Sequence, residues 1–157
     1  MKVKELNGIK QGELYRYHDG GGTAHLMLVI QLHDDPELGQ WANVMHCHTD
    51  YDKVTSLDVH LSTTAPTCEL PFDVVVQTDL FTGAPLETLT ERLGEIGDHE
   101  AWAVAKTFRE QTHDSPFHIT GAPLTGDTDP LWGYKVEQGK RCRFAQSILL
   151  ARLDGCC

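Results

Sequence analysis

The chain has 157 residues, of which 40% are hydrophobic and 23% are charged, and its formal net charge is -10. This length and composition predict one globular domain over residues 1–157 and exclude a disordered or collagen-like protein. The five cysteines form no CxxC pair, so we expect reduced thiols in a soluble, cytoplasmic protein rather than a disulfide framework. No apolar run is long enough for a signal peptide or a bilayer-spanning helix, so no membrane partner is expected.

Five strands are expected before the first convincing helix, over residues 13–18, 25–32, 41–49, 56–62 and 72–79. The first is followed by three consecutive glycines, Gly20 to Gly22, which permit a turn. The continuous apolar run of the second strand predicts burial on both of its faces. The polar residues 33–39 are expected to form a loop. Strands that follow one another in this way favour an antiparallel or mixed sheet over βαβ units.

The segment 85–96 allows two interpretations. Its leucines and Ile96 have helical spacing, and Thr88 with Glu91 matches a capping box. Residues 92–96 also suit a short strand, and the two interpretations stay open at this point.

A helix is predicted over residues 98–111, because Ala101, Val104 and Phe108 recur at helical spacing. Residues 112–134 are rich in Thr, Gly, Pro and Asp and are expected to form a long connector that covers a cleft, wraps the surface or meets a partner. Residues 141–153 have the pattern of a second amphipathic helix, or alternatively of an edge strand.

The charge is unevenly distributed. Residues 1–100 hold 17 acidic against 6 basic side chains, whereas residues 101–157 hold 6 acidic against 7 basic ones. The net negative charge of residues 1–100 does not attract phosphates over long distances. The C-terminal segment is therefore the part of the chain with the most favourable charge for binding nucleic acid. Lys140, Arg141 and Arg143 are therefore the candidate nucleic-acid contacts; the alternative is a solvated basic face.

Three passages carry a resemblance to a known family. They are GELY at 12–15, VMHCHTD at 44–50, and VVVQTDL at 74–80 together with RLGEI at 92–96 and the helix that follows. On these passages, residues 11–111 resemble the MazF/PemK-type toxins, which have a small SH3-like barrel and cleave RNA. The resemblance implies a mostly β, α+β fold: a small antiparallel SH3-like barrel with a closing helix, and a connector and C-terminal extension over residues 112–157.

The resemblance also implies site residues. The family cuts RNA with an arginine near the start of the second strand and a Thr or Ser after the third. Thr49 matches the second position, whereas the arginine position falls near Thr23, Ala24 or His25. His25 is the candidate acid or base there, because imidazole titrates near neutral pH. The family's RNA-binding surface is basic and the matching region here is acidic, so a weakly active or inactive endoribonuclease is expected.

His46 and His48 form the polar cluster that most suggests a functional site, because on a strand they face the same side as Asp50. One interpretation is a zinc-type site with His60 as a fourth ligand. A second is a polar outer face with Cys47 in the core, and a third gives acid and base roles to the histidines without a metal. The outer-face interpretation is preferred, and no metal or cofactor is predicted.

The sequence therefore leads to two functional hypotheses. The first is a toxin-related protein that interacts with RNA, with candidate catalytic residues Thr49, His25, His46 and His48. The second is a non-catalytic module that binds a protein partner or a small ligand. By family analogy, a homodimer and an antitoxin are the expected protein partners.

Overall fold

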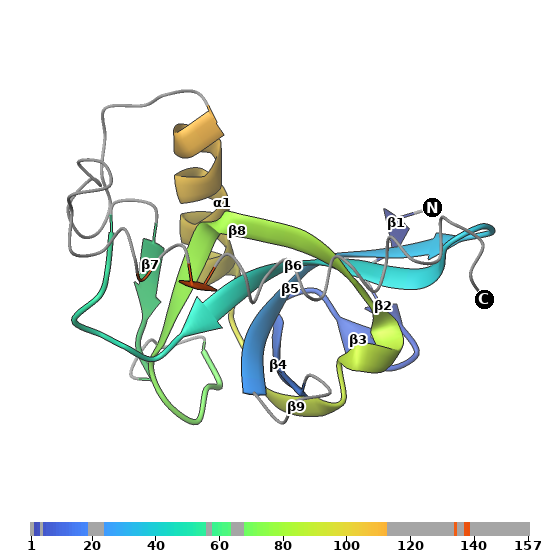
Figure 1. Cartoon of the computed structure of the whole chain (residues 1–157), viewed down its shortest axis with the longest axis horizontal. Helices are drawn as coiled ribbons and strands as arrows, with labels where there is room; N and C mark the ends of the chain where they lie inside the picture. Colours follow the sequence, from blue (N-terminus) through green and yellow to red (C-terminus); the bar gives the residue numbers. More distant parts are fainter. Residues whose placement is uncertain are drawn as a thin grey trace.

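The computed structural model describes residues 2–3, 5–18, 24–55, 58–63, 68–112, 134, 137 and 138. Over these residues the fold is mostly β with one long helix, which confirms the predicted α+β class (Figure 1). The strands are β1 Lys2–Val3, β2 Glu5–Leu6, β3 Ile9–Lys10, β4 Glu13–His18, β5 Ala24–Asp35, β6 Gly39–His48, β7 Asp58–Leu61, β8 Val74–Pro85 and β9 Glu91–Glu95. A short 3-10 helix, η1 (Leu86–Thr88), precedes β9, and the helix α1 (Asp98–Thr112) follows it.

The main sheet is antiparallel, with the strand order β7-β8-β6-β5-β4-β9 and with β1 added to β5. Strands β2 and β3 form a separate hairpin. The sheet is strongly curved: β4, β5 and β9 form an arc below β8, and the β5–β6 hairpin extends away from α1 (Figure 1). Register irregularities in the β5–β6, β6–β8 and β4–β9 pairs contribute to this curvature, because an extra residue on one strand bends it.

The two ends of the strand path approach each other at Glu69 and Glu95. The Glu69 N–H donates to the Glu95 carbonyl at 2.8 Å, and the Glu95 N–H donates to the Glu69 carbonyl at 3.0 Å. Gly94 permits this approach, since a Cβ at position 94 would lie 2.0 Å from the Glu69 carbonyl oxygen. These two backbone hydrogen bonds link the segment between β7 and β8 to β9. The described residues contain no β-ladder between β7 and β9 themselves.

The predicted loop over residues 33–39 is wrong, because β5 and β6 continue through most of it. The connection is a tight turn in which the Asp35 carboxylate accepts the Glu37 and Leu38 N–H groups at 2.8 and 3.0 Å, and Gly39 takes a φ of +77°. Residues of this segment pair across the β5–β6 hairpin. For example, the His33 ring stacks on the Trp41 ring, with 4.0 Å between the ring centroids.

The strand interpretation of residues 92–96 is confirmed by β9, and the helix predicted over residues 98–111 is confirmed by α1. The Thr88 hydroxyl donates to the Pro85 carbonyl at 2.6 Å within η1 instead of capping a longer helix. The predicted element over residues 141–153 lies outside the described residues, as does most of the connector over residues 112–134.

The sheet buries apolar side chains on both faces, as predicted for the second strand. One face, which we call the inner face, includes the buried residues Tyr15, Tyr17, Met27, Val29, Leu32, Ala42 and Val44. The other, the helix face, includes Leu14, Leu28, Met45, Cys47, Val59, Val74 and Val76, and it packs against Val104 of α1. None of the described helices is long and apolar enough to cross a membrane.

Candidate histidine site

Four predicted side chains come together in one pocket. His25, His46, His48 and Thr49 line a cavity of about 130 Å³ at the ends of β5 and β6. The rest of the lining comes from Ala24, Leu26, Cys47, Asp50 and Gln138. A cavity of this size suits a small polar group and is too small for a drug-sized ligand. We call it the histidine pocket.

Strand register explains why the imidazoles meet. Met27 pairs with His46, and directly opposed residues of an antiparallel pair point to the same face. His25 lies two residues before Met27 and therefore shares that face, and His48 does so relative to His46. The His25 and His46 rings lie 5.7 Å apart in an edge-to-face arrangement, and the Tyr17 ring lies 5.5 Å from His25.

The predicted wet outer face for His46 and His48 is wrong. The exposed fractions are 3% for His25, 1% for His46 and 6% for His48. These histidines continue the inner face beyond Met27 and Val44, and Tyr134 and Gln138 from the C-terminal part of the chain lie against this end of it. Cys47 does lie in the core of the opposite face, as predicted, and its burial raises the pKa of the thiol.

The rim of the pocket is polar. The Asp50 N–H donates to His48 Nδ1 at 3.0 Å, so that nitrogen acts as an acceptor and a neutral His48 ring carries its proton on Nε2. The Tyr134 hydroxyl donates to Asp50 Oδ2 at 2.6 Å, and its ring meets His48 edge-on at 5.1 Å. Lys53 Nζ lies 5.6 Å from the centre of the Tyr134 ring and brings a positive charge to this rim.

The sequence analysis missed Gln77, Gln138 and Tyr134 as parts of this site. The buried amide of Gln77 in β8 donates to Gln138 Oε1 at 3.2 Å, across 61 residues of sequence. The polar residue at position 77 ends the Val74–Val76 apolar run, which was a usable signal. Gln138 has no comparable signal, because only the tertiary fold brings it to the pocket.

His60 does not belong to the histidine pocket, so the four-ligand metal interpretation is wrong. Strand β8 separates β7 from β6, since Val75 pairs with His60 on one side and with His48 on the other. His60 Nε2 instead contacts Asp73 Oδ2 at 3.1 Å. Within the described part of the chain, no three His, Cys, Asp or Glu side chains are arranged to hold a metal ion. The predicted nucleic-acid contacts Lys140, Arg141 and Arg143 lie outside the described residues.

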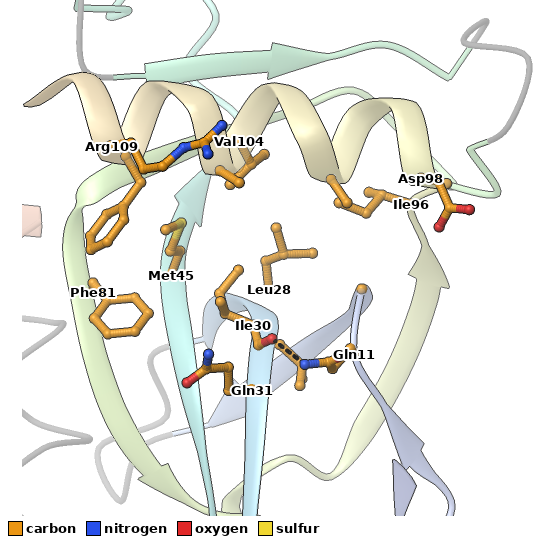
Figure 2. Close-up of a pocket in the computed structure, with 16 residues that line it drawn as sticks. Gln11, Leu28, Ile30, Gln31, Met45, Phe81, Ile96, Asp98, Val104 and Arg109 are labelled. Atoms are coloured by element: carbon orange, nitrogen blue, oxygen red, sulfur yellow. Dashed lines mark hydrogen bonds between the residues drawn. The ribbon is translucent and has the colours of Figure 1, made fainter. Parts of the chain in front are cut away.

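A second, larger cavity lies between α1 and the helix face of the sheet. It has a volume of about 540 Å³ and a mainly apolar lining. Figure 2 shows Leu28, Ile30 and Met45 on the strand side, with Val104 and Arg109 on α1. The Gln11 side-chain amide closes the lower side by donating to the Ile30 carbonyl at 3.0 Å. We call this cavity the helix groove.

The comparisons with known proteins add no identification: the chain matches no protein-family model and no functionally curated protein.

Proposed function

We propose that this chain is a MazF/PemK-like protein that interacts with RNA through the histidine pocket, as a weak or inactive endoribonuclease. The observation that carries the proposal is the convergence of His25, His46, His48 and Thr49 on one cavity. His25 lies in β5 and Thr49 directly follows β6; Thr49 matches the family's Thr or Ser position, and His25 lies near the family's arginine position.

The chemistry of the lining suits a phosphate group. Imidazole donates hydrogen bonds to phosphate oxygens and takes a proton near neutral pH, and a threonine hydroxyl donates a further bond. For cleavage, one histidine removes the proton of the ribose 2′-hydroxyl as its oxygen attacks the adjacent phosphorus, and another protonates the departing 5′-oxygen. Among the described residues no guanidinium lines the pocket, so none of them offers a bidentate cationic partner to the charge that builds on the phosphate, which favours weak activity.

We infer that the curved sheet is a divergent SH3-like barrel. Its support is the antiparallel strand order, the bends in β5 and β6, and the bridge between Glu69 and Glu95 that brings the two ends of the strand path together. The helix that follows β9 and covers one face corresponds to the closing helix that the resemblance implies.

Anisotropy of a labelled single-stranded RNA pool at low salt tests the proposal, together with a cleavage assay with and without a chelator. Wild-type protein should bind, with affinity that falls as salt rises. Thr49→Ala should weaken binding about threefold to tenfold, because it removes one hydrogen-bond donor at the rim. Thr90→Ala is the matched control, since Thr90 is exposed and does not line the pocket. Intact RNA and no binding at low salt would remove the proposal.

A second candidate function is the binding of a small apolar ligand in the helix groove. The volume of about 540 Å³ favours it, because ligand sites typically occupy about 300–1,000 Å³ and are mostly apolar. The ligand would lie along Leu28, Ile30 and Met45, with Phe81 and Phe108 at one end.

Displacement of an environment-sensitive apolar dye tests the second function. Ala105→Trp should abolish dye binding, because the indole fills the groove that Ala105 lines. Lys106→Trp is the control on the next position of α1, which does not line the groove. Equal dye binding by both variants would count against the helix groove as a ligand site.

A further inference from the structure

An exposed aromatic pair lies near the histidine pocket and plays no part in it. Tyr51 follows β6 and is 46% exposed, although large aromatic side chains usually contribute to cores. Its ring is parallel to that of His60 within 1°, with the centroids 5.3 Å apart. We call these two side chains the aromatic platform.

Both members of the platform are fixed at their polar ends by one residue. The Tyr51 hydroxyl donates to the Asp73 carbonyl at 2.7 Å, and His60 Nε2 contacts the Asp73 carboxylate at 3.1 Å. The second carboxylate oxygen accepts the Thr63 N–H at 2.8 Å. The rings are therefore held in place before any ligand arrives, which reduces the entropy lost on binding.

The platform and the histidine pocket lie on the same side of the sheet. His60 and His48 both pair with Val75, and directly opposed side chains share a face. Two strand spacings of about 4.8 Å separate β7 from β6, so the backbones at His60 and His48 are about 10 Å apart. Neighbouring nucleotides of an extended single strand can span such a distance.

We propose that the aromatic platform is a base-stacking subsite for single-stranded RNA, in which a nucleobase lies on the open face of Tyr51 while a nearby phosphate enters the histidine pocket. One face of Tyr51 already packs on His60, and the exposed part of the residue offers the other face. Aromatic stacking accepts any base, so this subsite strengthens binding without fixing a sequence.

The electrostatics at the platform permit this ligand. The Asp73 carboxylate is compensated by its bonds to Thr63 and His60, which also lower its pKa. A stacked base is uncharged, so the acidic body of the protein does not oppose it as it opposes a phosphate backbone. Residues 1–100 contain few lysines and arginines that could contact phosphates. Stacking therefore contributes binding energy that does not depend on these basic side chains.

This inference rests on the proposed RNA interaction, and the test separates the two. The probe is a set of short single-stranded RNAs that carry the fluorescent base 2-aminopurine at successive positions. Wild-type protein should quench the fluorescence at one position. Tyr51→Leu should abolish that quenching and weaken binding about tenfold. Tyr51→Trp should retain both properties.

Trp102→Leu is the matched control, because Trp102 is 56% exposed but lies on α1, on the opposite side of the sheet. It should bind RNA like the wild type. An abasic nucleotide at the quenched position should weaken wild-type binding by the same factor and should not weaken Tyr51→Leu further.

Two results would overturn the inference in distinguishable ways. If Thr49→Ala weakens RNA binding and Tyr51→Leu binds and quenches like the wild type, the platform is not a subsite and the RNA function stands. If wild-type protein binds no RNA at low salt, the proposed function fails and the subsite fails with it.

Discussion

The two faces of the sheet are equally well buried but differ in chemistry. The helix face is apolar from Val59 to Met45, and α1 covers it. The inner face is apolar from Tyr15 to Ala42 and then becomes polar, at His25, His46 and His48. A buried polar group costs free energy unless it finds partners, so such a change within a core face needs an explanation that packing does not supply.

The difference teaches where to look for function in this chain. On the inner face three buried histidines gather at the ends of β5 and β6 and line a pocket, whereas the lining of the helix groove is mainly apolar. Two residues from far along the chain reach this region: the Tyr134 hydroxyl donates to Asp50, and Gln138 accepts a hydrogen bond from Gln77. The inner face therefore contains both an apolar core and the histidine pocket. The helix face contains an apolar core with the helix groove beside it.

The largest expected effect comes from a substitution that separates the backbone bridge between Glu69 and Glu95, which joins the two ends of the strand path. Gly94→Ala would place a Cβ 2.0 Å from the Glu69 carbonyl oxygen, so the bridge between Glu69 and Glu95 must separate. We expect a loss of about 4 kcal/mol in the free energy of unfolding, measured by urea denaturation. Gly8→Ala is a useful control, because a Cβ at position 8 meets nothing within 4 Å although its φ of +82° adds some strain. Equal losses in the two variants would contradict the role of this bridge.

Neighbouring residues on opposite faces sharpen the comparison. Met45→Ala on the helix face should cost about 3 kcal/mol, because it leaves a cavity beside Leu28. His46→Leu on the inner face should cost about 1 kcal/mol, because the volume is nearly kept while hydrogen bonding is lost. The effects on RNA binding should be reversed: His46→Leu weakens it and Met45→Ala leaves it unchanged. RNA binding that depends on Met45 instead would move the site to the helix face.

A smaller effect tests whether the distant segment belongs to the site. Tyr134→Phe removes the hydroxyl that donates to Asp50 and should cost about 0.5 kcal/mol in the free energy of unfolding. Asp50→Asn and the double variant complete a double-mutant cycle, which isolates the energy of the pair. A coupling energy of zero would mean that Tyr134 and Asp50 do not interact in solution.

The smallest effect concerns the pH dependence of Asp73, the residue that both side chains of the aromatic platform contact. The Thr63 N–H and His60 lower the pKa of this carboxyl group, so it stabilises the fold above its unfolded-state value of about 3.9. That contribution is lost as the pH falls through the lower, folded-state value. The urea midpoint of wild type should therefore exceed that of Asp73→Asn at pH 7, and the difference should shrink below about pH 4. A difference that grows on acidification would contradict the assignment.

Strands β4 to β8 and α1 could be predicted because their signals are local, whereas the two-residue strands β1, β2 and β3 were not predicted. The apolar run of β5 and the spacing of Ala101, Val104 and Phe108 each suffice for one element. The extension of the β5–β6 hairpin could not, because it depends on pairs such as His33 with Trp41 that form only across strands. A stretch of polar residues therefore resembled a loop.

The candidate site was predictable in its members and not in its environment. The resemblance and the strand period selected His25, His46, His48 and Thr49. Their burial depends on contacts with other elements, such as that of Tyr134 with His48, and alternation along one strand cannot report it. The same alternation correctly placed Cys47 opposite to its neighbours, because that relation lies within a single strand.

The most direct measurement is an NMR titration with a short single-stranded RNA, which follows the ring signals of the histidines and the methyl signals of Met45 and Ala105. We expect the signals of His25, His46 and His48 to shift together at one saturating RNA concentration, with His60 following and the two methyl groups unchanged. Unperturbed histidines, or shifts confined to the methyl groups of the helix groove, would contradict the assignment of the inner face as the functional face.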